Sequence, residues 1–321
     1  MLLKPNKIIQ RINKMVEWKN ILKKRASTDL SMYSDFSIPS LSKQEKEHIV
    51  LVQIRRGKYT VADKSSYNDN PYKDMMVNRI SVIEYFMKKL NLSDISDCSI
   101  PFYVWDSYGD ELSFPHFCWA KPHNKKGLLF PCWSFKNWDE VVDEAKSYAV
   151  SWKDKENDAY FRGTERTTPR SKLRTTMQKI FPEYIKLDAP YEKWTEMFKH
   201  KVLFDIGGNK PWSVRSPLIA LSGSVPFRLL QYYPKWGEQP WIQFYEDPDE
   251  ITNNALKITQ NYDKEFIPSK EFVEACHQTL GGSLRKWKRA QSIQKRMMQL
   301  KEEDIVFYLE YLLKEFAEKQ N

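Results

Sequence analysis

The chain has 321 residues, a formal net charge of +9, 41% hydrophobic residues and 14% aromatic residues. This length suggests about two domains, and the apolar content excludes a disordered chain. No stretch approaches eighteen apolar residues and the N-terminus lacks the apolar run of a signal peptide, so we expect a soluble, cytoplasmic protein without a transmembrane helix.

The positive charge is concentrated near the two ends of the chain. Residues 1–25 hold eight basic side chains and one acidic side chain, and residues 285–296 hold six basic side chains and no acid. Such runs form solvated faces or meet anionic partners. A solvated face is the preferred interpretation, and a peripheral contact with an anionic surface stays open.

Cysteine and histidine positions signal neither a disulfide framework nor a metal site. The cysteines are widely spaced without a CxxC pair (Cys98, Cys118, Cys132, Cys276), and no two histidines have convincing ligand spacing (His48, His116, His123, His200, His277). These spacings therefore give no sign of a bound metal or of another cofactor.

The first half of the chain is predicted to form a basic helix followed by an α/β layer. Residues 1–48 predict a helix followed by a Ser/Pro-rich linker. Residues 48–63 alternate around Arg-Gly and predict a hairpin, and residues 77–92 place apolar side chains on one helical face. Residues 100–106 are an apolar run that predicts a buried strand ending in Asp106.

The remaining elements continue the alternation of strands and helices. A charged break near residues 153–158 separates the two halves. Further strands are expected at 128–135, 159–163, 199–208, 225–231 and 241–247, and further helices at 137–152, 172–180, 212–224, 247–261 and 302–316.

This alternation predicts an α/β fold with two doubly wound halves and a cleft between them. The expected segments are a basic N-terminal helix and linker (1–48), a first domain (49–155), a second domain (156–300) and a C-terminal amphipathic helix (301–321).

Four motifs, taken in order, resemble the CAP10-type glycosyltransferases, glycosyltransferase family 90. They are "IRRGKYTV" with the arginine-led helix at Arg79, "IPFYVWDSYG", "AYFRGTERT" and "VLFDIGGNKPWSVRSPLIALSGSVPF". The resemblance spans roughly residues 48–315. The sequence departs from the family where Ser216-Pro217 follow Arg215, and where Tyr103 and Tyr108 replace the Asn and Pro that flank the family's acid.

The resemblance implies a GT-B-like fold of two Rossmann-like domains that face each other across a cleft. It implies an inverting, metal-independent transfer of glucose or xylose from a UDP-sugar to a hydroxyl of a glycan or protein acceptor. Without a signal peptide or disulfides, the chain looks more like the soluble family members of microbes and large viruses.

The candidate donor site is the group of residues around the two strand ends of the second half. Paired guanidinium groups suit phosphate oxygens, and glycines let a backbone approach them closely. Together with the resemblance, this gives ten candidate donor-binding residues: Arg162, Gly163, Thr164, Arg166, Thr167, Asp205, Gly207, Gly208, Ser213 and Arg215.

The candidate catalytic base is Asp106, at the end of a predicted strand in the first half. An inverting transfer needs a base that takes the proton of the acceptor hydroxyl. The family's acid falls at this position, and a turn or capping aspartate is the alternative.

Two other functions remain open at this point. Asp247 and Asp249 form a DxD pair that would hold a divalent cation in a metal-dependent transferase, although capping of a following helix is the preferred interpretation. The basic ends would also suit a non-enzymatic nucleic-acid-binding protein, although no nucleic-acid motif appears.

Overall fold

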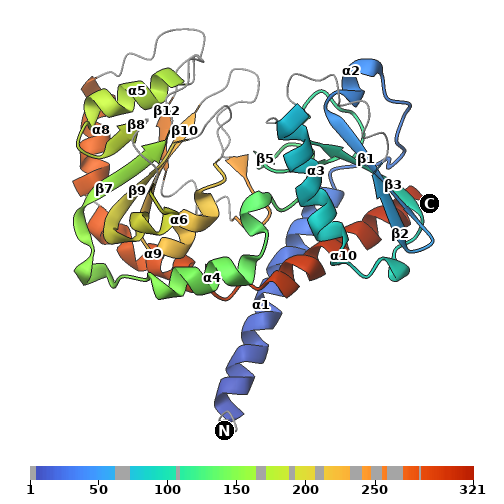
Figure 1. The fold of residues 1–321 in the computed structure, drawn as a ribbon, viewed down its shortest axis with the longest axis horizontal. Coiled ribbons are helices and arrows are strands. Elements are labelled where there is room, and N and C mark those ends of the chain that lie inside the picture. The colour runs from blue at the N-terminus through green and yellow to red at the C-terminus, as the bar shows by residue number, and fades with distance from the viewer. Residues whose placement is uncertain are drawn as a thin grey trace. The chain divides into compact units, whose positions relative to one another are not determined.

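The computed structural model describes residues 5–61, 73–105, 109–163, 171–187, 192–206, 213–231, 241–246, 255–258, 270–281 and 283–321. The chain divides into two compact units (Figure 1). Met1–Trp138, Ile242–Tyr245 and Gln299–Asn321 form the first, and Asp139–Trp241 with Glu246–Met298 form the second.

The first unit contains a five-stranded sheet in the order β2-β1-β3-β4-β6. β1 pairs antiparallel with β2 and β3, whereas β3, β4 and β6 pair in parallel. The antiparallel pairs make this sheet mixed, so only its β3-β4-β6 part has the parallel pairing of the Rossmann-like domain expected for the first half. Its elements are α1 (Pro5–Leu30), α2 (Lys43–Lys46), β1 (Ile49–Arg55), β2 (Lys58–Val61), α3 (Lys73–Met87), η2 (Leu92–Asp94), β3 (Cys98–Tyr103), β4 (Phe117–Cys118), β5 (Lys121–Pro122), β6 (Leu128–Leu129), η3 (Trp133–Phe135) and α10 (Glu302–Gln320).

The hairpin predicted around Arg-Gly is confirmed. β1 and β2 are joined by Arg56 and Gly57, whose φ angles of 50° and 71° are both positive. Two consecutive residues with positive φ form a type I′ turn, whose twist matches that of the two strands of a hairpin. Glycine adopts a positive φ without steric cost.

Helices α1 and α10 belong to the first unit and pack on each other (Figure 1). The predicted C-terminal helix buries one apolar face that includes Leu309, Leu312 and Phe316. The Phe316 ring contacts Phe36 after α1 and Phe117 on β4. The two ends of the chain are therefore part of one core, whereas the sequence suggested separate terminal segments.

The second unit is built on a wholly parallel sheet in the order β12-β10-β9-β7-β8. In chain order this is the 2-1-3-4-5 arrangement of flavodoxin-like doubly wound folds. Its elements are α4 (Trp138–Ser147), η4 (Trp152–Asp154), β7 (Glu156–Gly163), α5 (Ser171–Ile180), β8 (Ile185–Leu187), η5 (Trp194–Lys199), β9 (His200–Asp205), α6 (Ser216–Ser222), β10 (Val225–Gln231), β12 (Ala255–Ile258), α8 (Lys270–Gly281) and α9 (Ser283–Met297).

The two faces of this sheet are covered by different helices. Ala159, Phe161 and Phe204 pack against Met177 and Phe181 in one buried cluster, which joins β7 and β9 to α5 and the segment that follows it. Side chains alternate along a strand, so the next residues in each strand point to the opposite face. α6 lies near η5 and α9, away from α5 (Figure 1).

Three predicted elements are wrong or shortened. The helix expected over 247–261 is replaced, in its described part, by β12, which pairs in parallel with β10. Pairing with the sheet overrides local helix propensity there. The strand expected over 128–135 shrinks to β6 followed by η3, and the strand expected at 241–247 shrinks to β11 (Trp241–Ile242), which pairs with β5.

None of the helices in the described ranges is both long enough and apolar enough to span a bilayer.

Candidate functional site

The strand order of the second unit identifies one place where a ligand is expected to bind. In doubly wound sheets the ligand lies beyond the carboxyl ends of the two strands at which the order reverses. Those strands are β7 and β9. β7 ends in Arg162-Gly163 and β9 ends in Asp205, so the structure brings these predicted site residues to the same edge of the sheet.

A cavity of about 390 Å³ opens at this part of the sheet. Its wall is largely apolar, and charged side chains reach it from β7, from the segment before η5 and from the residue before α6. The apolar wall includes Trp194, Met197, Leu203, Leu218 and Ile219, and the charged side chains are Arg162, Glu192, Lys193 and Arg215. An apolar pocket with a few charged groups is the usual form of a small-molecule site.

Arg162 is held in place by an acidic partner. Its guanidinium forms an ion pair with Glu192, and the Tyr160 hydroxyl donates to the same carboxylate oxygen at 2.8 Å. Hydrogen bonds from Arg162 and Tyr160 lower the pKa of Glu192. The same contact with Glu192 raises the pKa of Arg162, while burial raises that of Tyr160. Arg162 is therefore oriented at the cavity with its charge balanced by a carboxylate.

Arg215, unlike Arg162, packs against an aromatic ring and not against a carboxylate. Its guanidinium lies 4.7 Å from the centre of the Phe161 ring, and within the described residues it has no hydrogen bond or ion pair. Burial lowers its pKa and the nearby Asp205 carboxylate opposes this shift. A guanidinium remains protonated even so. Arg215 thus presents a desolvated positive charge to the cavity.

Gly163 allows this close arrangement. A β-carbon at residue 163 would lie 2.9 Å from the Phe161 ring and 3.3 Å from Nη2 of Arg215. Distances below 3.0 Å require a neighbour to move. Glycine therefore lets the end of β7, the Phe161 ring and the Arg215 guanidinium pack together.

Asp205 does not line the cavity; its carboxylate connects neighbouring elements of the second unit through hydrogen bonds. Its Oδ2 accepts hydrogen bonds from Ser216 Oγ at 3.0 Å and from Arg228 Nε at 2.7 Å, and Arg228 also pairs with Glu246 at 2.8 Å. This buried carboxylate connects β9 to α6 and β10. Ser213 is buried nearby, where its Oγ accepts the backbone N–H of Arg215 at 3.1 Å.

The comparison with protein families bears on this geometry. Residues 24–244 match the family model described as glycosyl transferase family 90. The chain belongs to this family. The match covers more than half of the sequence and includes the ends of both β7 and β9. No curated protein matches the sequence. The protein is therefore a glycosyltransferase, as the order of its motifs predicted.

Several predicted site residues lie outside the described part of the glycosyltransferase. They are the candidate base Asp106, the donor-site residues Thr164, Arg166, Thr167, Gly207 and Gly208, and the alternative metal ligands Asp247 and Asp249. Their roles stay predictions.

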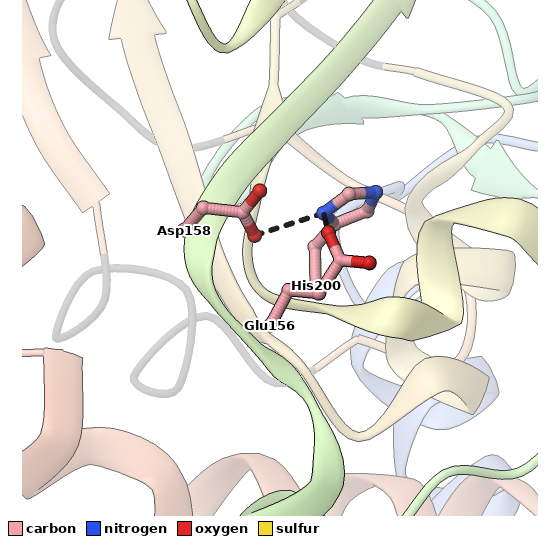
Figure 2. A group of neighbouring side chains, drawn as sticks. All are labelled: Glu156, Asp158 and His200. Carbon is pink, nitrogen blue, oxygen red and sulfur yellow. Dashed lines mark hydrogen bonds and ion pairs between the residues drawn. The ribbon is translucent and has the colours of Figure 1, made fainter.

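The structure also brings together three side chains that the sequence reasoning did not connect. Glu156 and Asp158 on β7 meet His200 at the start of β9 (Figure 2). The acids are two residues apart at the beginning of one strand, and the histidine begins the neighbouring parallel strand. Only the pairing of β7 with β9 reveals the cluster, because 42 residues separate Asp158 from His200.

Proposed function

We propose that this glycosyltransferase transfers glucose or xylose from a UDP-sugar, with inversion, to a hydroxyl of a glycan or protein acceptor. The diphosphate of the donor would lie in the cavity at the ends of β7 and β9. A GT-B-like arrangement, in which the other domain supplies the base Asp106, follows from the family resemblance and is part of the proposal.

The observation that supports the donor site most strongly is the guanidinium of Arg215, which has no hydrogen-bond or ionic partner among the residues that the structure describes. Burying a charge without a partner is costly, so such groups are normally paired. A diphosphate would supply the partner. It also gains negative charge as the glycosidic bond breaks, and a fixed cation beside it stabilises that charge.

The apolar wall fits the rest of such a donor. Trp194 and Met197 offer surface against which a base or a sugar ring would pack, and Tyr160 presents a hydroxyl at the same cavity. Thr164, Arg166, Thr167, Gly207 and Gly208 would complete the diphosphate site.

Calorimetric titration with UDP tests the site. Arg215→Ala should weaken binding by about 1.5–3 kcal/mol, the usual loss for a charged contact, or roughly 10- to 150-fold. Lys288→Ala, an exposed basic residue on α9, is the matched control and should bind UDP like the wild type. Unchanged affinity in Arg215→Ala would refute the site.

The reaction is tested separately. Arginines would take the place of a metal at the diphosphate, so donor turnover should survive EDTA and Asp249→Ala should stay active. Loss of activity in EDTA that Mn²⁺ restores would favour a metal-dependent reaction through Asp247 and Asp249 instead. Hydrolysis of a panel of nucleotide sugars would identify the donor.

A further inference from the structure

The cluster of Glu156, Asp158 and His200 lies where β7 and β9 begin (Figure 2). Glu156 is the register partner of His200, and the ladder between the two strands shifts between Glu156 and Ala159. Such an irregularity re-aims side chains near it. In a regular strand the side chains of Glu156 and Asp158 would lie along one face. Here both carboxylates reach the imidazole of His200.

The distances within the cluster are close to those of a metal site. Nδ1 of His200 lies 2.8 Å from Oδ1 of Asp158 and 3.4 Å from Oε2 of Glu156. All three donor atoms lie within 4.8 Å of one another. Bonds of about 2.1 Å in a tetrahedral site place neighbouring donor atoms about 3.4 Å apart. The distance from His200 to Glu156 already equals this spacing, and the distance from His200 to Asp158 would have to widen by about 0.6 Å.

The histidine is already fixed in position. Its ring stacks on Tyr160, with centroids 4.5 Å apart and planes only 4° from parallel. Its backbone carbonyl accepts a hydrogen bond from Ser224 Oγ at 2.6 Å. Metal-binding histidines are typically oriented by such surrounding contacts, which lower the cost of binding the ion.

Exposure and charge also suit an ion. The His200 side chain is 14% exposed, and those of Asp158 and Glu156 are 34% and 59% exposed, so the donor atoms are reachable from solvent. Three lysines are adjacent to the cluster in sequence, and each has another contact. Lys199 pairs with Glu196, Lys201 lies 5.8 Å from the centre of the Trp152 ring, and Lys155 donates to the Phe198 carbonyl oxygen and to Ser224 Oγ. With neutral His200, the two carboxylates leave a negative charge that a cation would balance.

We propose that Glu156, Asp158 and His200 bind one divalent transition-metal ion. One imidazole nitrogen and two carboxylate oxygens are a donor set that suits Zn²⁺, with water completing the coordination. The ion would join the first residues of β7 to the first residue of β9.

This site is separate from the proposed donor site. Glu156 is the first residue of β7 and Gly163 the last, and these two residues lie about 20 Å apart along the strand. Tyr160 lies between the two sites, since its ring stacks on His200 and it also lines the cavity, but it supplies no ligand to the ion. The ion would stabilise the sheet and would not touch the diphosphate. The proposal is therefore independent of how the transfer reaction proceeds.

A zinc competition assay with a chromogenic chelator tests the proposal on the full chain. The wild type should bind one equivalent of Zn²⁺ more than His200→Gln. Asp158→Asn should lower the affinity for this additional equivalent by at least tenfold. His277→Gln and Glu183→Gln are matched controls that remove an exposed histidine and an exposed carboxylate outside the cluster, and both should retain the site. Equal zinc uptake by all five proteins would overturn the proposal, since the zinc would then be bound elsewhere.

Thermal unfolding gives a second readout that does not depend on activity. An ion that binds only the folded state raises the melting temperature as its concentration increases. Zn²⁺ should raise the melting temperature of the wild type and of both controls, but not the melting temperature of Asp158→Asn. If the wild type neither binds Zn²⁺ nor is stabilised by it, the cluster is only an ion pair of protonated His200. UDP affinity, measured on the same samples, shows independently whether the donor site is correct.

Discussion

Arg162 and Glu192 form an ion pair at the cavity, and Tyr160 donates to the same carboxylate at 2.8 Å. Since Arg162 keeps the pKa of Glu192 low, the carboxylate is ionised throughout the neutral range. A phosphate that binds Arg162 must therefore replace this carboxylate or share the guanidinium with it.

We expect Glu192→Gln to bind UDP more tightly than the wild type. The substitution removes a negative charge beside the proposed diphosphate and the ion pair of Arg162 with Glu192, which should raise affinity by up to about fivefold, the range of an exposed ion pair. Calorimetry on Glu192→Gln measures this, and Glu196→Gln, an acid on η5 that does not line the cavity, is the control. A weaker affinity would mean that Glu192 itself holds the donor, for example through a ribose hydroxyl.

Gly163→Ala should damage both stability and donor binding. The added methyl would meet the Phe161 ring, which is buried in a packed cluster and whose centre lies 5.6 Å and 4.7 Å from the guanidinium carbons of Arg174 and Arg215. Overpacking of this kind costs about 1–3 kcal/mol. Urea unfolding and UDP calorimetry should both show a loss. Normal values in both would mean that the Phe161 ring turns away without disturbing Arg215.

Asp205→Ala should reduce stability more than it reduces intrinsic donor affinity. Asp205 is buried and pairs with Arg228, so its removal leaves a largely buried guanidinium with Glu246 as its remaining partner among the contacts described above. Breaking a buried pair from one side costs about 3–5 kcal/mol. Urea unfolding should reveal the loss, and the fraction that remains folded should bind UDP nearly as the wild type does. A large loss of affinity in fully folded protein would place Asp205 in contact with the donor.

The sequence predicts Arg162 and Gly163 at the end of a strand, and Arg215 in the first turn of a helix over 212–224. In the structure that helix, α6, begins one residue after Arg215. These positions follow from local signals: an apolar run that ends at a glycine, and a turn before an amphipathic segment. The family itself was also recognisable, because it is carried by the order of short motifs.

The partners of these residues could not be predicted in the same way. Glu192 and Arg162 are brought together by the fold, and no local pattern marks Glu192 as a partner. The same holds for His200, which meets Glu156 and Asp158 only because β7 and β9 are neighbours. β12 was mistaken for a helix because its pairing with β10 is a non-local interaction.

Asp106→Asn should separate catalysis from donor binding. A general base acts on the acceptor hydroxyl as the transition state forms, so it contributes little to the affinity for the donor. Asparagine keeps the shape of the side chain but takes up no proton at neutral pH. Turnover should fall by about 10²–10⁴-fold, while UDP affinity and the melting temperature stay near wild type. Near-normal turnover in a folded variant would assign the base to another residue, such as Asp110 or Glu111.

Lys155, just before β7, is a buried lysine whose visible partners are uncharged. Its ammonium donates to the carbonyl oxygen of Phe198 and to Ser224 Oγ at 3.0 Å. Burial lowers the pKa of Lys155 from 10.5 to about 8. Below pH 8 both the folded and the unfolded chain carry the proton, and the full cost of burying the charge is present.

The stability of the protein should therefore rise with pH where Lys155 titrates. Between about pH 8 and 10.5 the unfolded chain binds more protons than the folded chain, so the free energy of unfolding increases with pH. The shift corresponds to a gain of the order of 3 kcal/mol across this window. Urea unfolding at pH 7.5, 9 and 10 should show the rise in the wild type and in Lys153→Met, an exposed neighbour, but not in Lys155→Met. The comparison with Lys153→Met cancels the titration of other groups, and parallel curves for all three proteins would mean that Lys155 stays fully solvated in solution.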